Sequence, residues 1–179
     1  MRVYPTLAVC QAKYFPHFAV ILVLSALLSG FFFSKPSWQQ INRAIDRNYP
    51  EVSDIGSDSL KHLLNSRQAV TIIDVRGKKE YRVSHLPGAI HSEDPTAIQL
   101  PKSSTIVVYC SVGIRSAAFA RSLIGRGYKK VHNLRGGIFE WANKDYPLSR
   151  NGARVHAVHP YDKNWGTLVR PELHATELQ

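Results

Sequence analysis

The sequence predicts an α/β fold built on a parallel sheet, and two observations support this prediction. Short apolar runs rich in β-branched residues, most clearly residues 70–74 and 105–109, are bounded by turn residues, as is typical of strands buried on both faces. Segments with helical periodicity alternate with these runs, which favours parallel strands joined by helices. The chain has 179 residues, enough for one domain with a real core and additions at both ends.

An uncharged apolar run occupies residues 14–34, between Lys13 and Lys35. At about 1.5 Å per helical residue it reaches roughly 30 Å, enough to cross the hydrocarbon core of a bilayer. We therefore expect one transmembrane helix or signal anchor there, after an N-terminal flank of residues 1–13. A cleaved signal peptide is the rival interpretation, but no small-x-small pair of the kind found at cleavage sites lies near the end of the run. A transit peptide is a further alternative, since no acidic residue precedes Asp46.

Residues 35–52 are polar and mixed, and we interpret them as a juxtamembrane linker that includes a short amphipathic helix at 39–45. Ser57 or Asp58 can then cap a helix that continues to about Asn65. The following elements are expected after it: a strand at 70–74, a helix at 78–84, a brief strand at 89–90, a helical turn at 96–100, a strand at 105–109, a helix at 117–124 and a strand at 131–134.

Cys110 directly follows the strand at 105–109 and precedes a loop that contains Gly113 and Arg115. It therefore lies at the carboxyl end of a strand, where open α/β sheets bind ligands. Amides of the loop and of the next helix would stabilise negative charge on its sulfur. The other cysteine, Cys10, precedes the apolar run, so no disulfide framework can be drawn within the domain. A packing residue requires neither the glycine nor the cation, so we interpret Cys110 as a catalytic nucleophile.

The cysteine loop, residues 110–115, is expected to bind the substrate. A thiolate surrounded by amides and a guanidinium attracts a tetrahedral anion, and it could attack sulfur or phosphorus. From the residues alone, both reactions stay open. The predicted substrate-binding residues are Ser111, Val112, Gly113, Ile114 and Arg115.

Five segments in this region resemble the rhodanese-type sulfurtransferases. They are the Cys-x-x-Gly-x-Arg-Ser loop from Cys110, the Asp-Val-Arg strand end at 74–76, the Glu-Tyr pair at 80–81, the His-Leu-Pro-Gly-Ala turn at 85–89 and the Gly-Gly-Ile-Phe-Glu-Trp segment at 136–141. They occur in the order found in that family. The resemblance covers residues 53–149 and implies a rhodanese-like three-layer α/β/α sandwich around a parallel sheet, with residues 150–179 as a C-terminal extension.

The resemblance also implies an activity. In this family the loop from cysteine to arginine runs six residues, as it does from Cys110 to Arg115, whereas related phosphatase-like loops are one residue longer. It implies that Cys110 attacks the outer sulfur of a thiosulfate-like donor, that sulfite leaves, and that the amides of residues 111–115 stabilise the resulting persulfide. A thiol or protein cysteine, or cyanide in the test tube, then takes the sulfur without a metal or organic cofactor. Two alternatives stay open: a persulfide carrier or sensing module with little turnover, and a phosphatase or arsenate reductase.

Other polar residues near these segments are interpreted as structural. The resemblance implies largely structural roles for Asp74 and Arg76, and a histidine beside a tight turn, such as His85, usually satisfies backbone groups. Phe139 and Trp141 are expected in the core or in a pocket wall. In the C-terminal extension, we expect five apolar residues to form a strap over the domain or a partner contact. They are Val155, Val158, Tyr161, Trp165 and Leu168.

The charge distribution and the absence of metal-binding motifs limit the classes of partner that the sequence predicts. The net charge is +10, but lysine and arginine are scattered and no nucleic-acid-binding motif occurs, so we expect no nucleic-acid partner. His156, His159 and Asp162 are too weak a set to predict a metal site. The sequence therefore predicts a single-pass membrane protein, and basic residues on both sides of the apolar run leave the side of the membrane open.

Overall fold

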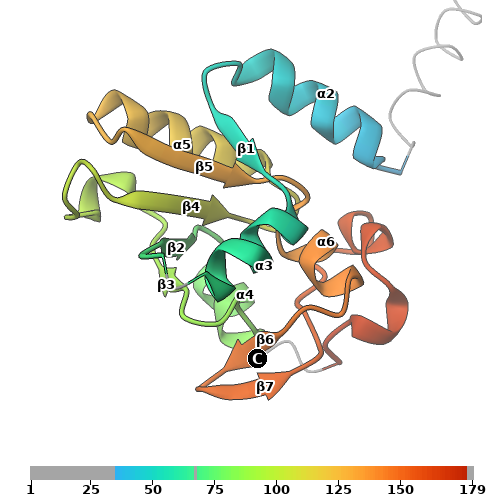
Figure 1. The fold of residues 1–179 in the computed structure, drawn as a ribbon. Helices are drawn as coiled ribbons and strands as arrows, with labels where there is room; N and C mark the ends of the chain where they lie inside the picture. Colours follow the sequence, from blue (N-terminus) through green and yellow to red (C-terminus); the bar gives the residue numbers. More distant parts are fainter. Residues whose placement is uncertain (1–34, 67, 177–179) are drawn as a thin grey trace, which may run out of the picture. The chain divides into compact units, whose positions relative to one another are not determined.

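The computed structural model of the chain describes residues 35–66 and 68–176 (Figure 1). Its centre is a five-stranded sheet in the order β1-β5-β4-β2-β3, with every neighbouring pair parallel. The strands are β1 (Ser53–Ile55), β2 (Thr71–Asp74), β3 (Ile90–His91), β4 (Thr105–Tyr109) and β5 (Lys130–Leu134). This arrangement confirms the predicted α/β fold with a parallel central sheet.

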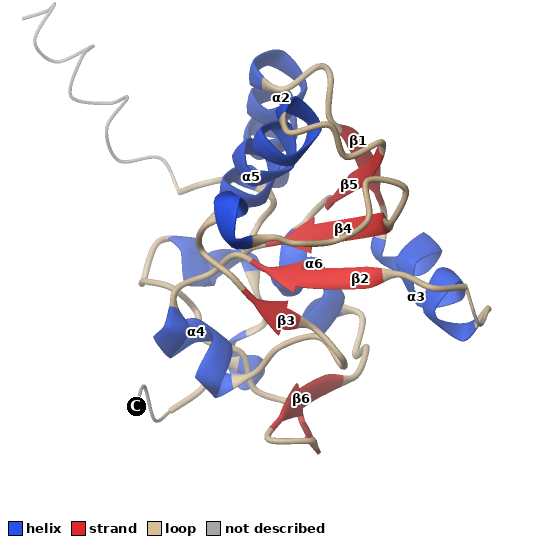
Figure 2. Cartoon of the chain, turned by 90° about the vertical axis from the view of Figure 1, so that its left-hand side faces the viewer, coloured by secondary structure: helices blue, strands red, loops and turns tan. Residues whose placement is uncertain are grey.

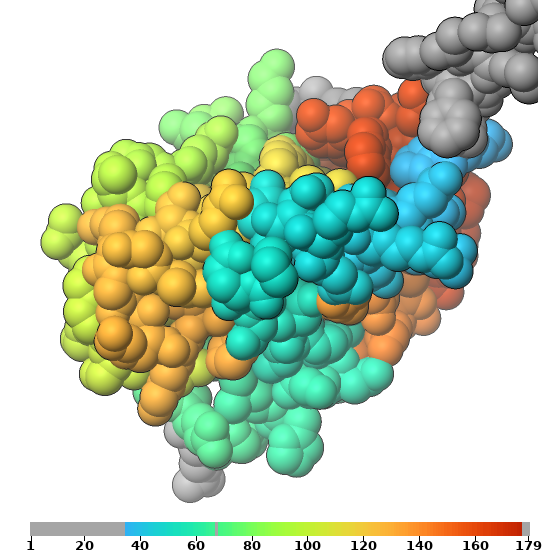
Figure 3. Space-filling view, turned by 90° about the horizontal axis from the view of Figure 1, so that it is seen from above, coloured from blue at the N-terminus to red at the C-terminus, as the bar shows by residue number. Residues whose placement is uncertain are grey.

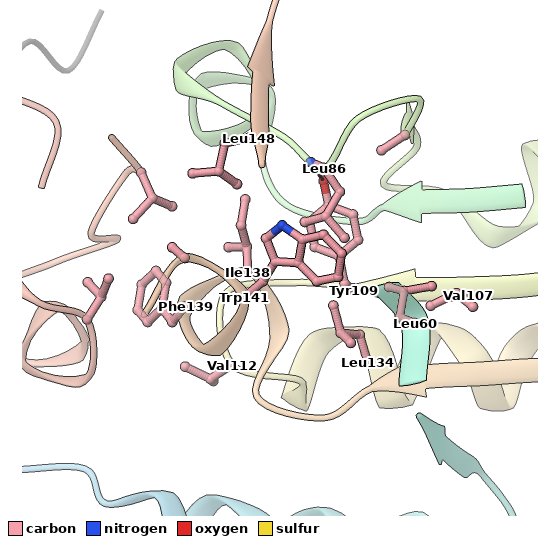
Figure 4. Packing of buried hydrophobic residues seen from close by; sticks show 14 of the residues in the cluster. Leu60, Leu86, Val107, Tyr109, Val112, Leu134, Ile138, Phe139, Trp141 and Leu148 are labelled. Carbon is pink, nitrogen blue, oxygen red and sulfur yellow. Dashed lines mark hydrogen bonds between the residues drawn. The ribbon is translucent and has the colours of Figure 1, made fainter. Parts of the chain in front are cut away.

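Helices cover both faces of the sheet (Figure 2). They are α2 (Trp38–Asn48), α3 (Ser57–Asn65), α4 (Lys78–Val83), α5 (Ile114–Gly125) and α6 (Gly137–Asn143), with short 3-10 turns at η1 (Pro95–Ala97), η2 (Trp165–Leu168) and η3 (Pro171–Leu173). Successive side chains of a strand point to opposite faces. Accordingly, Ile73 and Val108 pack in the cluster that contains most buried residues of α5, whereas Ile72 and Val107 pack in the cluster that contains those of α3 and α6. Figure 4 shows the second cluster, with Val107 labelled.

The segment at 35–52 differs from the linker interpretation, because most of it is the helix α2. Ser37 caps this helix, since its side chain accepts from the Gln40 amide while the Gln40 side chain accepts from the Ser37 amide. Ile41 and Ile45 are only 3% and 2% exposed and belong to the core. α2 lies beside α5, and Figure 3 shows it in blue next to the red C-terminal segment. The amphipathic pattern predicted the helix but not the depth to which it is buried.

The C-terminal extension also contributes to the core. An antiparallel hairpin of β6 (Leu148–Arg150) and β7 (Ala153–Val155) joins the domain to the extension. Beyond the hairpin, Val158, Val169 and Leu173 are buried in a core cluster, and Val155, Trp165 and Leu168 pack against that cluster. The extension therefore forms most of the predicted strap. Tyr161 is the exception, because 47% of its surface stays exposed.

The membrane prediction falls on another part of the chain. Within residues 35–66 and 68–176, no helix has both the length and the apolar character that a membrane span requires. The expected span at 14–34 lies outside the described residues, so it stays a prediction.

Candidate active site

Cys110 immediately follows β4, the central strand of the sheet, at its carboxyl end. The apolar strand predicts this position because parallel strands of an α/β sheet present their carboxyl ends to the ligand. The cysteine is only 1% exposed, and its Sγ accepts a hydrogen bond of 3.2 Å from the amide of Gly113. α5 begins at Ile114, so the sulfur lies at the positive end of a helix of 12 residues.

Several amides of the cysteine loop are available to an anion. Among the described residues, the backbone N–H groups of Val112, Ile114 and Arg115 have no hydrogen-bond acceptor. The first N–H groups of a helix lack an intrahelical partner, and they commonly bind phosphate, sulfate or carboxylate. The loop can therefore hold the oxygens of a tetrahedral anion or the terminal sulfur of a persulfide.

Gly113 allows the loop to turn into α5. Its φ of 104° lies in the left-handed region that side-chain-bearing residues rarely adopt. A methyl group there would lie 3.2 Å from Cδ1 of Ile45 and 3.4 Å from the carbonyl oxygen of Leu134. The glycine therefore serves both the turn and the close packing of α2 and β5 behind the loop.

The N-terminus of α6 supports the cysteine loop through two backbone hydrogen bonds. The amide of Ile138 donates to the carbonyl of Cys110 at 2.9 Å, and the amide of Phe139 donates to the carbonyl of Ser111 at 3.1 Å. Gly137, with φ of 54°, makes this approach possible, because a Cβ at this position would lie 2.3 Å from the Cys110 oxygen. The Gly-Gly-Ile-Phe segment thus supports the backbone of the cysteine loop, while Phe139 itself is a core residue.

Arg115 is engaged by a carboxylate. Its two terminal nitrogens donate to Glu80 at 2.9 and 2.8 Å, and one of them also donates to Ser111 Oγ at 3.0 Å. Ser111 Oγ in turn donates to Glu80 at 3.0 Å. Burial alone would raise the pKa of Glu80, but the hydrogen bonds and charge of Arg115 outweigh burial and lower that pKa. Glu80, on α4, therefore locks the two ends of the loop together.

The loop and the C-terminal extension enclose one cavity of about 130 Å³, which we call the cysteine pocket. It is lined by Cys110, Ser111, Val112, Ile114, Arg115, Tyr161 and Trp165. Four of the five predicted binding residues thus line the cavity, while Gly113 lies behind the sulfur. The sequence did not predict that Glu80 binds Arg115, because Glu80 entered only as part of the family resemblance. It also did not predict that Tyr161 and Trp165 line the pocket, because both were interpreted as part of a strap. The spacing of these two aromatic residues was the only indication in the sequence that they lie together.

Asp74 and Arg76 form a fully buried ion pair of 2.7 Å that organises the neighbouring turn. Arg76 also donates to the carbonyl of Ser84 at 2.5 Å, and the Tyr109 hydroxyl donates to Asp74 at 2.6 Å. Burial and the charge of Asp74 raise the pKa of Tyr109 well above its ordinary value, so this phenol keeps its proton. His85 stacks on Tyr81 and bonds through Nδ1 to the Tyr81 carbonyl at 3.1 Å. These contacts are structural, as predicted.

The fold and the site together define an α/β domain in which a buried cysteine, Cys110, lies between the central strand and a helix N-terminus. The profile of the rhodanese-like domain matches residues 57–144. A sulfurtransferase of Allochromatium vinosum is 34% identical over 101 residues, which are 54% of this chain and 94% of that protein. The chain therefore belongs to the rhodanese-like family of sulfurtransferases and sulfur carriers.

Two further comparisons agree with this assignment. A putative sulfur carrier protein of Bacillus subtilis is 31% identical over 101 residues, which are 54% of this chain and 55% of that protein. The solution structure of a rhodanese-like domain from an Anabaena protein superposes with a TM-score of 0.51 at 28% identity, covering 54% of this chain and 78% of that one. Each similarity spans only about half of this chain.

Proposed function

We propose that this chain is a rhodanese-type sulfurtransferase in which Cys110 carries the transferred sulfur. One observation carries the proposal: Cys110 lines a pocket, its sulfur accepts a hydrogen bond from the Gly113 amide, and neighbouring loop amides have no other acceptor among the described residues. In the first half-reaction the thiolate attacks the outer sulfur of a thiosulfate-like donor, the S–S bond of the donor breaks, and sulfite leaves with the bonding electron pair. The product is a Cys110 persulfide.

The second half-reaction returns the thiolate. A nucleophilic acceptor, which we take to be a thiol or a protein cysteine, attacks the outer sulfur of the persulfide and leaves the Cys110 thiolate behind. Cyanide serves as an experimental acceptor and gives thiocyanate. Because donor and acceptor react in turn with the same sulfur, the scheme predicts ping-pong kinetics. No step in it requires a metal or an organic cofactor.

A persulfide carrier with little turnover is a second candidate. The similarity to the Bacillus subtilis protein named as a putative sulfur carrier favours it. The two candidates share the first half-reaction and differ in the second. A carrier would load one sulfur on Cys110 and release it slowly to cyanide or small thiols, whereas an enzyme would complete many turnovers.

Intact-mass spectrometry of the full 179-residue chain tests both candidates. We expect thiosulfate to add one sulfur atom, cyanide to remove it, and the Cys110→Ser variant to gain none. Steady production of thiocyanate would support the enzyme, and a single loading event would support the carrier. If neither thiosulfate nor an organic sulfane-sulfur donor loads Cys110, the sulfur-transfer proposal is wrong.

We also propose that residues 14–34 attach the chain to a membrane. This proposal rests on the uncharged run in the sequence. Fractionation of cells that express the full chain tests it: the protein should sediment with membranes and resist extraction by carbonate at high pH. Release by carbonate would contradict a spanning anchor.

A further inference from the structure

The cysteine pocket has two walls of different chemical character. The cysteine loop supplies amides and the Arg115 guanidinium, and residues Tyr161 and Trp165, which we call the aromatic wall, close the opposite side. The aromatic wall lies outside the segment that matches the family profile, which ends at residue 144. A donor that reaches the nearly buried Cys110 through this pocket therefore passes between the two walls.

The side chains of the pocket offer a doubly charged anion little net electrostatic attraction. Arg115 is the only cation among the lining residues, and both of its terminal nitrogens are bound by Glu80. The Tyr161 ring also lies over the guanidinium, 5.0 Å from its central carbon. Since Glu80 has a lowered pKa and stays ionised near neutral pH, the Glu80–Arg115 pair carries no net charge. The pocket thus offers polar donors but little net positive charge.

The aromatic wall is held in place by its own turn. The Tyr161 amide donates to Nδ1 of His159 at 3.0 Å, and Asp162 accepts from the amides of Asn164 and Trp165 at 2.8 and 2.9 Å. Tyr161 has a φ of 67°, a conformation that costs a side-chain-bearing residue on the order of 1 kcal/mol or more. A backbone that accepts this cost at an exposed tyrosine indicates a role for the side chain.

The segment is also tied to the body of the domain through Asn143 at the end of α6. The Asn143 side chain donates to the carbonyl of Leu168 at 2.8 Å and accepts from the amide of Arg170 at 2.9 Å. Trp165 packs against the main core cluster. The aromatic wall is therefore a fixed part of the pocket in this structure.

We infer that the pocket selects a sulfur donor whose sulfane sulfur is carried on a small apolar organic group, in preference to inorganic thiosulfate. This inference rests on the proposed function and deepens it. The donor class is the organic thiosulfonates, in which two sulfonyl oxygens can accept from the loop amides while the organic group lies against Tyr161 and Trp165. A cavity of about 150 Å³ accepts a benzene ring in another protein. The cysteine pocket, with about 130 Å³ and an exposed edge at Tyr161, suits a group of similar or smaller size.

The chemical step balances as it does for thiosulfate. The Cys110 thiolate attacks the terminal sulfur of the thiosulfonate, a new S–S bond forms, and the bond between the terminal sulfur and the sulfonyl sulfur breaks. The organic sulfinate leaves with that electron pair. No oxidant, reductant or proton is consumed, and the persulfide is the same intermediate as before.

Donor kinetics test the selection on the full chain. Thiosulfate, methanethiosulfonate and benzenethiosulfonate undergo the same displacement at their terminal sulfur and differ in charge, in organic group and in whether sulfite or a sulfinate leaves, so the change in their ratio between variants is the decisive measurement. We expect kcat/KM with cyanide to rise in that order, with benzenethiosulfonate at least about tenfold above thiosulfate. In Tyr161→Ala and Trp165→Ala the ratio of the benzenethiosulfonate to the thiosulfate value should fall about tenfold.

A matched control separates selection from general damage. Tyr146 is another partly exposed tyrosine with a cation over its ring, Lys61 at 4.1 Å, and it does not line the pocket. Tyr146→Ala should keep the wild-type ratio. Equal kcat/KM for the three donors in the wild type, or an unchanged ratio in both aromatic-wall variants, would overturn the inference while leaving sulfur transfer intact.

A binding measurement separates the inference from the proposed function. In Cys110→Ser, which cannot form a persulfide, calorimetry should show benzenesulfonate binding about tenfold more tightly than sulfate. Adding Tyr161→Ala should remove that preference. Preferential binding without any sulfur transfer in the wild type would support the selective pocket and overturn the sulfurtransferase. Transfer without preferential binding would overturn the selective pocket.

Discussion

Each of the two walls of the cysteine pocket contains one residue with a positive φ, but the residue is a glycine in one wall and a tyrosine in the other. In the cysteine loop the position is Gly113, with φ of 104°. In the aromatic wall it is Tyr161, with φ of 67°. Glycine adopts this region at little cost, whereas a tyrosine there stays strained. The loop thus presents backbone amides to the pocket, and the aromatic wall presents side chains.

This difference between the walls suggests a division of roles, in which the loop binds anions in general and the aromatic wall selects among sulfur donors. Amides at a helix N-terminus bind many anions and need no special side chain. Tyr161 and Trp165 add shape and apolar surface, and they lie beyond the segment that matches the family profile. We therefore expect substitutions in the loop and its supports to damage reaction or folding, and substitutions in the aromatic wall to change the choice of donor.

The largest expected effect comes from Cys110→Ser. The variant should lose persulfide formation completely, because the hydroxyl cannot accept a sulfane sulfur in a stable form. Mass spectrometry after thiosulfate treatment measures the loss, and circular dichroism checks the fold. Cys10→Ser is the matched control and should load normally, since Cys10 is the only other cysteine. Sulfur retained on the serine variant would place the nucleophile elsewhere.

Gly137→Ala should be the most destabilising change beside the loop. The added methyl group would lie 2.3 Å from the Cys110 oxygen and 2.6 Å from the Ser111 oxygen, at a positive φ. We expect a loss of roughly 2–4 kcal/mol in the free energy of unfolding, from strain and forced displacement of the loop. Urea denaturation measures this loss.

Gly127→Ala is the control for that experiment. It also has a positive φ, of 90°, but nothing lies within 4 Å of an added methyl group. It should lose about 1 kcal/mol from strain alone. Equal losses in the two variants would mean that contact with the loop carbonyls does not matter.

Glu80→Gln should have an intermediate effect on stability. The neutral amide cannot pair with the Arg115 charge, so we expect a loss of about 1–3 kcal/mol near neutral pH. The folded-state pKa of Glu80 is lowered from its ordinary value of 4.5. The stabilisation is therefore fully present above that value and is lost as pH falls through the lower folded-state pKa.

Denaturation of wild type and Glu80→Gln across pH measures this contribution. The difference between their free energies of unfolding should stay constant above about pH 6 and shrink below about pH 4.5. A difference that grows in acid would show that Glu80 is protonated more easily in the folded state, against the contacts described above.

The smallest expected effect on stability comes from Tyr161→Gly. Relief of strain in the folded state and greater freedom of the unfolded chain act in opposite directions, so stability should stay within about 0.5 kcal/mol of wild type. Gly113→Ala is the converse substitution, and its free energy of unfolding should fall by about 1–2 kcal/mol. Denaturation of the two variants tests the contrast between the walls directly. A large loss in Tyr161→Gly would make the tyrosine structural instead of selective.

Local patterns in the sequence predicted much of the fold. The strand at 105–109 and the helix after it depend on neighbouring residues, and they placed Cys110 correctly at the strand end. The pairing of Glu80 with Arg115 joins residues that are 35 apart in the chain, and no local pattern specifies it. The partners of the C-terminal strap could not be predicted for the same reason. The spacing of its apolar residues predicts that they are buried, but the residues they contact are distant in the sequence.

Other differences arise where burial depends on distant partners. The amphipathic pattern at 39–45 predicts a helix, but its core packing requires knowledge of where β5 and the loop lie. The helix α6 escaped prediction because two glycines at its start resemble a loop, although they are what lets its N-terminus approach Cys110. Family resemblance supplied the order of these segments, and only the structure supplied their contacts.

The position of Ile45 against Gly113 has a practical consequence for building fusion proteins. A module cut at the family match, residues 57–144, would omit α2, β1 and the buried residues Val158, Val169 and Leu173. Such a module would expose the back of its own cysteine loop to solvent. A unit that keeps these contacts begins at Ser37, which caps α2, and extends through Ala175, whose amide donates to the carbonyl of Val158.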